Sequence, residues 1–268
     1  MIQLKHDQLI DFLLRSELGF LGTIRMTILS LLVEIMQLTL LPILLFQGAK
    51  IRESALKLPE AQGPRVGESG VGRRLKIIFL GDSSACGVGV DRMEDSLSGH
   101  LIKELMKVNR CSWKVLAKSG ISIDGLRACI DQEPQTHFEI AILAVGMNDV
   151  TSGKSLSRWT ADLELIQESL RENFQISKII FSGIPPVRKL EIIPFPLRIV
   201  LALKAYIFDL SLQQFCYARR SCEYVSIDFS VCSGMLSKDG FHPSKKFYKT
   251  WAAKLSRKIR DFKYFSGN

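Results

Sequence analysis

Short apolar runs alternate with longer amphipathic segments along most of the chain, from residue 75 onward. Apolar runs of about four to eight residues bounded by turn signals are typical of buried strands. Strands that alternate with helices predict a parallel sheet covered by helices on both faces. We expect five strands, at Leu75–Leu80, Ser112–Ala117, Phe138–Val145, Lys178–Ser182 and Glu223–Ile227. The helices between and after them are expected at Met93–Val108, Ile123–Asp131, Ser155–Asn173, Leu197–Ala218 and Ser244–Phe262.

The first part of the chain has a different composition. Its apolar stretch, residues 27–47, is long enough to suggest a membrane span, although an acidic residue such as Glu34 costs about 2.5–3.5 kcal/mol at mid-bilayer. Four polar residues recur in it at spacings that place them on one helix face: Thr27, Ser30, Glu34 and Gln37. We therefore expect residues 1–57 to form an apolar, amphipathic helical segment that lies on a membrane. A tilted span and a helix docked on the rest of the protein are the alternatives.

Residues 58–74 are rich in glycine, proline and charge and contain little to bury. That composition is typical of a linker. We expect it to connect the N-terminal segment to one domain at residues 75–268. Membrane association, in a bacterium at the inner membrane, is the expected location. Basic residues flank the apolar stretch on both sides, so the side on which the domain lies stays open.

The charge and the cysteines exclude several classes of protein. The net charge is +9, and its C-terminal cluster of lysines and arginines is typical of the solvated face of a helix. No nucleic-acid-binding motif accompanies it, and we expect no nucleic-acid partner. The cysteines form no C-x-x-C pair and lie near no histidine at metal-ligand spacing, which argues against a zinc site. No metal or other cofactor is expected. Their redox state and the oligomeric state are left open.

Polar residues follow four of the candidate strands. Gly81-Asp82-Ser83-Ser84 follows the first strand, Lys118-Ser119-Gly120 the second, Gly146-Met147-Asn148-Asp149 the third, and Asp239-Gly240-Phe241-His242-Pro243 the last. Each motif alone is also ordinary turn or helix-cap chemistry. In a parallel sheet, however, the carboxyl ends of the strands meet at one edge. We therefore expect these residues to lie around a single site.

The residue types suit nucleophilic catalysis on an acyl group. Ser83 is the candidate nucleophile, and a serine hydroxyl needs a base to remove its proton. His242 is the candidate base, and Asp239 lies near enough in sequence to orient it. Attack on an ester creates an oxyanion, for which the backbone N–H groups of Ser83 and Gly120 and the side-chain amide of Asn148 are candidate donors.

These motifs together resemble those of the SGNH/GDSL hydrolase family. The matching blocks are LGDSSACGVGV (80–90), KSGISIDGL (118–126), AVGMNDVT (144–151) and DGFHPS (239–244), with Ser84 where the name motif has leucine. The residues that name the family correspond to Ser83, Gly120, Asn148 and His242. Ser182-Gly183-Ile184-Pro185-Pro186 and Phe195-Pro196-Leu197-Arg198 look like a proteobacterial subgroup that carries an apolar N-terminal segment.

The resemblance implies a flavodoxin-like α/β/α sandwich with a five-stranded parallel sheet and metal-independent ester hydrolysis by a Ser-His-Asp mechanism. The expected substrate is a small-molecule or lipid ester. If another alcohol intercepts the acyl-enzyme, the same site makes an acyltransferase. A membrane-associated binding protein without catalysis is the competing class. The natural acyl group and alcohol are not indicated by the sequence.

Overall fold

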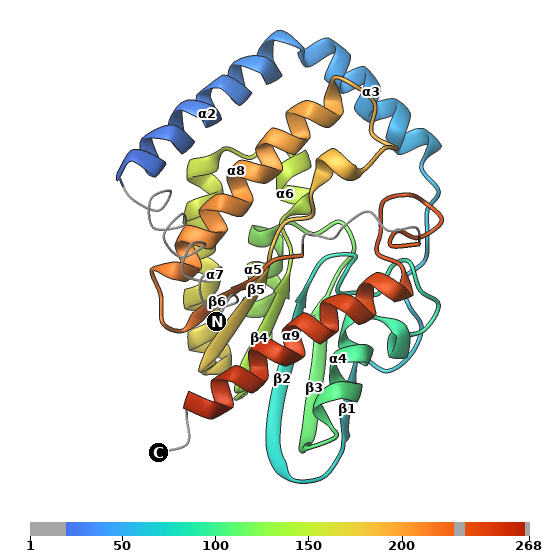
Figure 1. Ribbon diagram of the computed structural model, residues 1–268, viewed down its shortest axis with the longest axis vertical. Helices are drawn as coiled ribbons and strands as arrows, with labels where there is room; N and C mark the ends of the chain where they lie inside the picture. The colour runs from blue at the N-terminus through green and yellow to red at the C-terminus, as the bar shows by residue number, and fades with distance from the viewer. Residues whose placement is uncertain (1–19, 228–233, 266–268) are drawn as a thin grey trace, which may run out of the picture.

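A mixed α/β architecture is seen in the computed structural model, which describes residues 20–227 and 234–265. The first 19 residues of the expected N-terminal segment therefore lie outside the described residues. Figure 1 shows a central sheet with helices on both faces, and the first helices of the described residues, α2 and α3, laid across one end of it. The expected three-layer α/β/α fold is confirmed.

Six strands form the sheet, in the spatial order β1-β3-β2-β4-β5-β6. Their bounds are β1 Val66–Ser69, β2 Arg73–Gly81, β3 Asn109–Ala117, β4 Ile140–Ala144, β5 Lys178–Ser182 and β6 Cys222–Val225. The five strands β2 to β6 are parallel, and in chain order they lie 2-1-3-4-5, which is the flavodoxin-like order. The chain leaves β2 for β3 on one side and then crosses to β4 on the other. The site expected after β2 thus lies where the strand order reverses.

The sixth strand corrects the expectation of five strands and of a plain linker. β1 lies within residues 58–74 and pairs antiparallel with β3, from Val66 opposite Lys114 to Ser69 opposite Cys111. The same segment also pairs Gln62 with Arg92, and Ala61 is buried. These residues have few apolar side chains, so their order comes from backbone pairing with distant parts of the chain. Composition alone does not reveal such pairing.

Alternate residues of β2 contribute to the two halves of the core. Ile77 and Phe79 pack on the face covered by α4 (Leu97–Leu105) and α9 (Lys245–Phe265). Ile78 and Leu80 pack on the face covered by α5 (Ile123–Asp131), α7 (Leu156–Phe174) and α8 (Leu197–Tyr217). All four β2 side chains are almost completely buried. A strand buried on both faces reads as a continuous apolar run, which explains the pattern in the sequence.

Short helical elements complete the domain. η1 (Met93–Asp95) precedes α4, α6 (Met147–Thr151) follows β4, and η2 (Val187–Lys189) follows β5. The expected helix Met93–Val108 is therefore divided, because the Ser96 hydroxyl accepts a hydrogen bond from the Gly99 N–H and starts α4 anew. The other expected helices agree with α5, α7, α8 and α9 to within a few residues at their ends.

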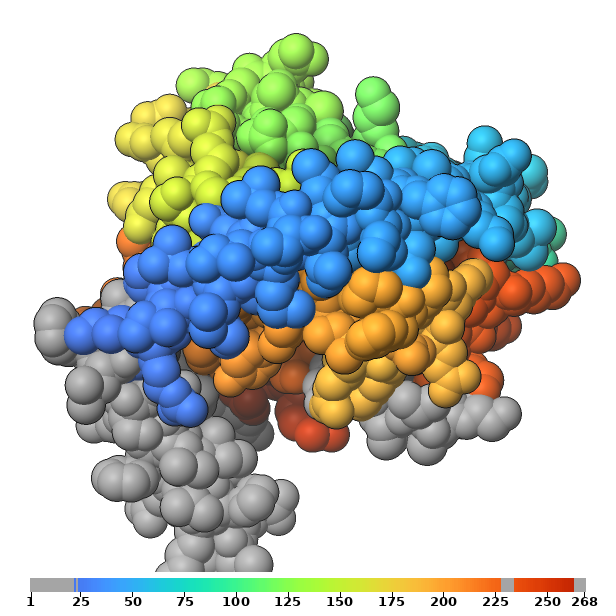
Figure 2. All heavy atoms as spheres, turned by 90° about the horizontal axis from the view of Figure 1, so that it is seen from above, coloured from blue at the N-terminus to red at the C-terminus, as the bar shows by residue number. Residues whose placement is uncertain are grey.

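The N-terminal helices α2 (Phe20–Thr39) and α3 (Leu41–Ser54) dock on the domain. Proline at position 42 has no N–H to continue the hydrogen bonding of α2, and the two helices are bent by 80° at this break. Met26 and Val33 of α2 and Leu44 of α3 are buried in the core beside α8. Figure 2 shows the pair as a continuous blue ridge across one face of the molecule.

The outward side of these two helices is apolar. Its most exposed side chains are Ile28, Leu31, Leu32, Ile35 and Leu38 of α2, followed by Leu41, Ile43, Leu45 and Phe46 of α3; we call these nine residues the outer apolar face. Of the expected polar residues, Ser30 and Gln37 are half-buried. The alternative of a helix docked on the domain thus describes part of the arrangement, but an apolar surface remains uncovered.

Length and composition single out few possible membrane spans within the described residues. α8 passes as a single helix, but 56% of the tested stretch is buried inside the protein. α2 and α3 pass only when taken as one bent pair. A buried core helix passes the same test, so this finding is weak support for a span.

Candidate active site

Ser83 lies immediately after β2, at the point where the strand order reverses. Gly81 is the last residue of β2, two positions before Ser83, and a Cβ built on it would lie 2.1 Å from the carbonyl oxygen of Ala144 on β4. The absence of a side chain therefore lets the first residues of the turn approach β4. The Asp82 N–H donates to that same Ala144 oxygen at 3.0 Å. The turn is consequently held against β4, with Ser83 at the edge of the sheet where ligands bind in such folds.

Hydrogen bonds connect Ser83, His242 and Asp239 in one chain. The His242 Nε2 lies 3.0 Å from the Ser83 Oγ, and its Nδ1 lies 2.6 Å from the Asp239 Oδ2. A carboxylate only accepts, so Nδ1 carries the proton when histidine is neutral. The Nε2 lone pair then faces the Ser83 hydroxyl. This is the geometry required for a histidine to remove a proton from serine.

The turn 236–243 holds Asp239 as a carboxylate. Its Oδ1 accepts from the Ser237 hydroxyl at 2.8 Å and from the N–H groups of Phe241 and His242 at 3.0 Å. Burial alone would raise the pKa of Asp239, but the hydrogen bonds from His242 and the turn outweigh it and bring the pKa below its ordinary value. Asp239 therefore stays ionised at neutral pH and can fix the orientation of the imidazole.

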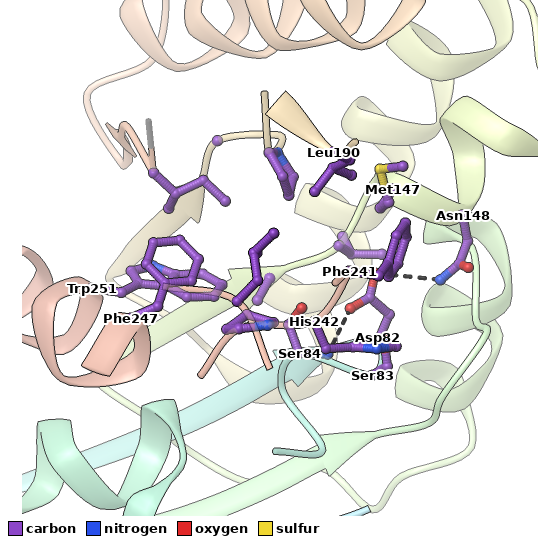
Figure 3. Close-up of a pocket in the computed structure, with 17 residues that line it drawn as sticks. Asp82, Ser83, Ser84, Met147, Asn148, Leu190, Phe241, His242, Phe247 and Trp251 are labelled. Atoms are coloured by element: carbon purple, nitrogen blue, oxygen red, sulfur yellow. Dashed lines mark hydrogen bonds between the residues drawn. The ribbon is translucent and has the colours of Figure 1, made fainter. Parts of the chain in front are cut away.

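Asn148 stands at the start of α6 and both of its amide N–H groups have acceptors. Its Nδ2 lies 2.9 Å from the Ile121 carbonyl oxygen and 3.3 Å from the Asp82 Oδ2. Figure 3 shows the bond to Asp82. The Asp82 Oδ1 accepts the Ser84 N–H at 3.0 Å. Burial raises the pKa of Asp82 to about 7. Asp82 thus joins the serine turn to the asparagine, a role that the sequence motif did not indicate.

Gly120 lies in the turn after β3, which runs beside the serine turn. The Lys118 N–H donates to the Gly81 carbonyl oxygen at 3.2 Å, and Asn148 holds the carbonyl of Ile121 on the other side of Gly120. The φ of Gly120 is +80°, a conformation that residues with a side chain rarely adopt. A Cβ at this position would meet no atom within 4 Å. The backbone conformation therefore favours glycine at this position.

Glu60 fixes the same turn from the segment expected as a linker. Its Oε1 accepts from the Ser119 N–H at 3.2 Å and from the Ser119 hydroxyl at 2.7 Å. Its Oε2 accepts from the Arg65 Nη2 at 2.5 Å, and Arg65 in turn donates to the Ala117 carbonyl. These bonds, led by that from the Ser119 hydroxyl, lower the pKa of Glu60 to about 2. Sequence reasoning missed this residue, because nothing around it distinguishes it from other linker acids.

Three carboxylates near α6 have the spacing of a metal site: Asp124, Asp149 and Asp162. The Lys154 Nζ lies 2.7 Å from Asp124 Oδ1 and Asp149 Oδ1 and 2.5 Å from Asp162 Oδ2. The ammonium group thus supplies the positive charge that these carboxylates require. Asp149 also accepts the Ile123 N–H at 3.1 Å, so the cluster ties α5 to the residue that follows Asn148.

Two cavities meet at the hydrogen-bonded residues. The smaller, about 50 Å³, is lined by Ser83 and also by Leu190, Phe247 and Trp251 (Figure 3). The larger, about 660 Å³, lies between α3 and α8. Met147, Asn148, Phe241 and His242 line both. The structure thus brings the expected residues Ser83, His242, Asp239 and Asn148 to one place, with the turn of Gly120 beside them.

Comparison with solved structures shows the same fold in other proteins. A lipolytic protein of the G-D-S-L family from Veillonella parvula is 16% identical, with a TM-score of 0.53 over 68% of this chain and 97% of that chain. A putative lipolytic protein of that family from Desulfitobacterium hafniense is 18% identical, with a TM-score of 0.51 over 68% and 98%. A family 3 carbohydrate esterase from Clostridium thermocellum is 18% identical, with a TM-score of 0.53 over 73% and 100%.

Comparison with protein families gives a match to the GDSL-like lipase/acylhydrolase family over residues 79–250. No curated protein matches the chain. The matched range contains Ser83, Gly120, Asn148, Asp239 and His242, and it excludes α2, α3 and β1. It spans more than half of the chain and agrees with the observed fold, so the resemblance to SGNH/GDSL hydrolases is confirmed. The protein is a member of the GDSL-like lipase/acylhydrolase family.

Proposed function

We propose that this protein hydrolyses carboxylic esters with Ser83 as the nucleophile. The observation that carries the proposal is the hydrogen-bonded chain from the Ser83 Oγ through His242 to Asp239, at 3.0 Å and 2.6 Å. Membership of an acylhydrolase family supports the same reaction class. The names of the related structures, two lipolytic proteins and a carbohydrate esterase, also suit an ester substrate.

The reaction follows from the positions of the three side chains. The Ser83 Oγ attacks the ester carbonyl carbon while its proton passes to the His242 Nε2. Asp239 stabilises the resulting imidazolium through Nδ1. That proton then passes to the alcohol oxygen as the carbon–oxygen bond breaks, leaving an acyl group on Ser83. Water attacks this acyl-enzyme, gives a proton to Nε2, and releases the acid as the proton returns to Ser83.

The donors that would stabilise the tetrahedral oxyanion are the N–H groups of Ser83 and Gly120 and the amide of Asn148. In the resting structure the longer bond of Asn148 is that to Asp82, at 3.3 Å. An oxyanion carries a full charge and accepts more strongly than a carboxyl group whose ionisation burial opposes. Asn148 would therefore exchange Asp82 for the oxyanion while it keeps its bond to Ile121.

Labelling with a fluorophosphonate tests the nucleophile. The expected result is that the wild-type protein forms a covalent adduct on Ser83 and that Ser83→Ala does not. Ser84→Ala is the matched control, because the bond from the Ser84 backbone N–H to Asp82 does not depend on its side chain. Equal labelling of wild type and Ser83→Ala, or no labelling of either protein, would overturn the proposal. Hydrolysis of a chromogenic butanoate ester by the same three proteins gives the rate comparison.

We also propose that the outer apolar face of α2 and α3 rests on a membrane surface. Nine large apolar side chains are exposed there, on two consecutive helices. Contiguous apolar surface of this kind marks contact with a membrane or another protein. The two helices are bent by 80°, and both are docked on the domain, which favours lying on the membrane over crossing it.

A further inference from the structure

The larger cavity is a groove walled on one side by a helix outside the family-matched residues. Leu41, Leu44 and Leu45 of α3 face Ile193, Leu197 and Val200 across it. Its volume of about 660 Å³ lies within the range of about 300–1,000 Å³ found for ligand pockets. A groove with aliphatic walls suits an apolar occupant. We refer to it as the α3 groove.

The inner end of the α3 groove reaches the proposed catalytic residues. His242, Asn148 and Phe241 line it, and the same three residues line the small pocket beside Ser83. That pocket, about 50 Å³, holds a few waters or a short acyl group. A substituent longer than this must extend elsewhere. The α3 groove is the continuation that begins at the same residues.

The outer end of the α3 groove opens onto the outer apolar face. Leu38, Leu41 and Leu45 belong to both, and the exposed fractions of their side chains are 72%, 44% and 59%. An alkyl chain that passes from the outer face to the site can therefore lie against the leucines of α2 and α3 and against Ile193, Leu197 and Val200. In water this face would be costly, whereas against a bilayer it continues the hydrocarbon phase.

The wall formed by α3 is fixed to the opposite side. The Gln47 Nε2 donates to the Phe195 carbonyl oxygen at 2.7 Å, and the Gln47 Oε1 accepts the Leu197 N–H at 3.2 Å. Leu44, on the side of α3 that faces the domain, is buried in the core. A side-chain amide that bonds in both directions to one loop holds α3 at a defined distance from α8. The groove is thus built into the fold.

We propose that the α3 groove binds the long acyl chain of a membrane lipid ester and that α3 is therefore part of the substrate site. In lipid esters the long apolar chain lies on the acyl side and the polar group on the alcohol side, so the aliphatic groove fits the acyl chain. The inference rests on the proposed ester hydrolysis and adds the substrate class. It also gives the N-terminal helices a role in selecting the substrate.

Gly48→Trp tests the wall directly. Gly48 lines the groove, and a Cβ built on it would meet only the end of the Arg52 side chain, at 3.8 Å, so an indole extends into open space. The adjacent Ala49→Trp is the matched control, since Ala49 is exposed and does not line the groove. Thermal unfolding of both variants checks that α3 remains docked.

The first measurement is the ratio of kcat/KM for a hexadecanoate ester to that for a butanoate ester of one chromogenic alcohol. Gly48→Trp is expected to lower this ratio about tenfold, the effect of losing contact with roughly two methylene groups. Ala49→Trp is expected to leave it unchanged. An unchanged ratio in Gly48→Trp overturns the proposal. A loss on hexadecyl acetate instead would show that the groove holds the alcohol chain, which also overturns it.

Binding gives a readout that does not depend on catalysis. Hexadecanoate is titrated into Ser83→Ala and into Ser83→Ala combined with Gly48→Trp. The expected result is binding by the first protein and at least about tenfold weaker binding by the second. Equal binding by the two proteins, or no binding by either, overturns the proposal that the α3 groove binds the acyl chain, even if the protein cleaves esters. Groove-dependent binding by a wild-type protein that cleaves no ester would reject the proposed hydrolysis and keep the groove.

Discussion

The sheet domain and the α2–α3 pair place their apolar residues in opposite ways. In β2, Ile77, Ile78, Phe79 and Leu80 are buried on both faces of the sheet. In α2, Met26 and Val33 face the domain, while Ile28, Ile35 and Leu38 are more than half exposed. The domain therefore has the apolar residues that its packing requires, whereas the helix pair has more than its docking uses. The excess lies on one side of the pair, where the apolar side chains are exposed.

The two regions meet at the larger cavity, and both contribute residues to its walls. The domain supplies His242, Asn148 and the start of α8, and the helix pair supplies the aliphatic wall of α3. The proposed chemistry and the proposed membrane contact thus belong to different parts of the sequence that lie next to each other in the fold. If this division is correct, substitutions in one region change one property and leave the other.

The largest expected effect is on the chemistry of the domain. Asp239→Asn should lower kcat for butanoate hydrolysis by about 10⁴-fold, because an amide can donate to Nδ1 and then favours the tautomer that presents N–H to Ser83. Binding to vesicles should not change. Asp261→Asn, on the exposed side of α9, is the control and should retain full activity. Loss of vesicle binding in Asp239→Asn would contradict the division between the regions.

The next effect concerns the outer apolar face. Ile28→Glu combined with Ile35→Glu should lower the fraction of protein bound to phospholipid vesicles at least tenfold, since each side chain contributes on the order of 1.5 kcal/mol when buried in hydrocarbon. Both residues are more than half exposed and neither lines the larger cavity. Butanoate hydrolysis in solution should be retained. Unchanged flotation with vesicles would show that this face does not bind the membrane.

A smaller effect is expected at Glu60, in the segment between the two regions. Glu60→Gln should lower kcat about tenfold with little change in KM, because the charged hydrogen bonds that hold the Ser119 turn beside Gly120 are weakened. Glu168→Gln, an exposed position on α7, is the control. An equal loss of activity in both variants would show that the effect is not specific to this turn.

The smallest effect is on stability in acid. The pKa of Glu60 is lowered from 4.5 to about 2 in the folded protein, so the carboxylate stabilises the fold above pH 4.5, and this contribution is lost as the pH falls toward 2. The side chain is 38% exposed, so the contribution is modest. Urea unfolding at pH 7 and at pH 3 should show a smaller pH dependence for Glu60→Gln than for wild type. An identical dependence in the two proteins would contradict this prediction.

Strands and helices that follow from the local pattern of apolar residues can be predicted from the sequence. Elements that depend on pairing with a distant part of the chain cannot. The strand Lys178–Ser182 and the helix Ile123–Asp131 were predicted with the bounds that the structure has, because strongly apolar or amphipathic segments are bounded by turn residues. Ser83 and His242 were expected at one place because the carboxyl ends of parallel strands converge. β1 was missed, since its order depends on pairing with β3 rather than on its own side chains.

The contacts around the site could not be predicted from the sequence either. Three features depend on how separate elements are placed in the fold. They are the hydrogen bond between Asn148 and Asp82, the hydrogen bond from Ser119 to Glu60, and the outward orientation of the apolar side of α2. Periodicity indicated that α2 has a polar face and an apolar face. It did not indicate that Ser30 and Gln37 would lie partly against the domain.

The short strands at the two margins of the sheet have a consequence for self-association. β1 and β6 are each four residues long, and Glu68 of β1 is paired with Arg110. Short edge strands, one of which carries a charged side chain, offer few free backbone groups with which a neighbouring chain could extend the sheet. Fibre-like growth through strand addition is therefore disfavoured at both ends. Detergent that masks the outer apolar face should accordingly be sufficient to keep the purified protein dispersed.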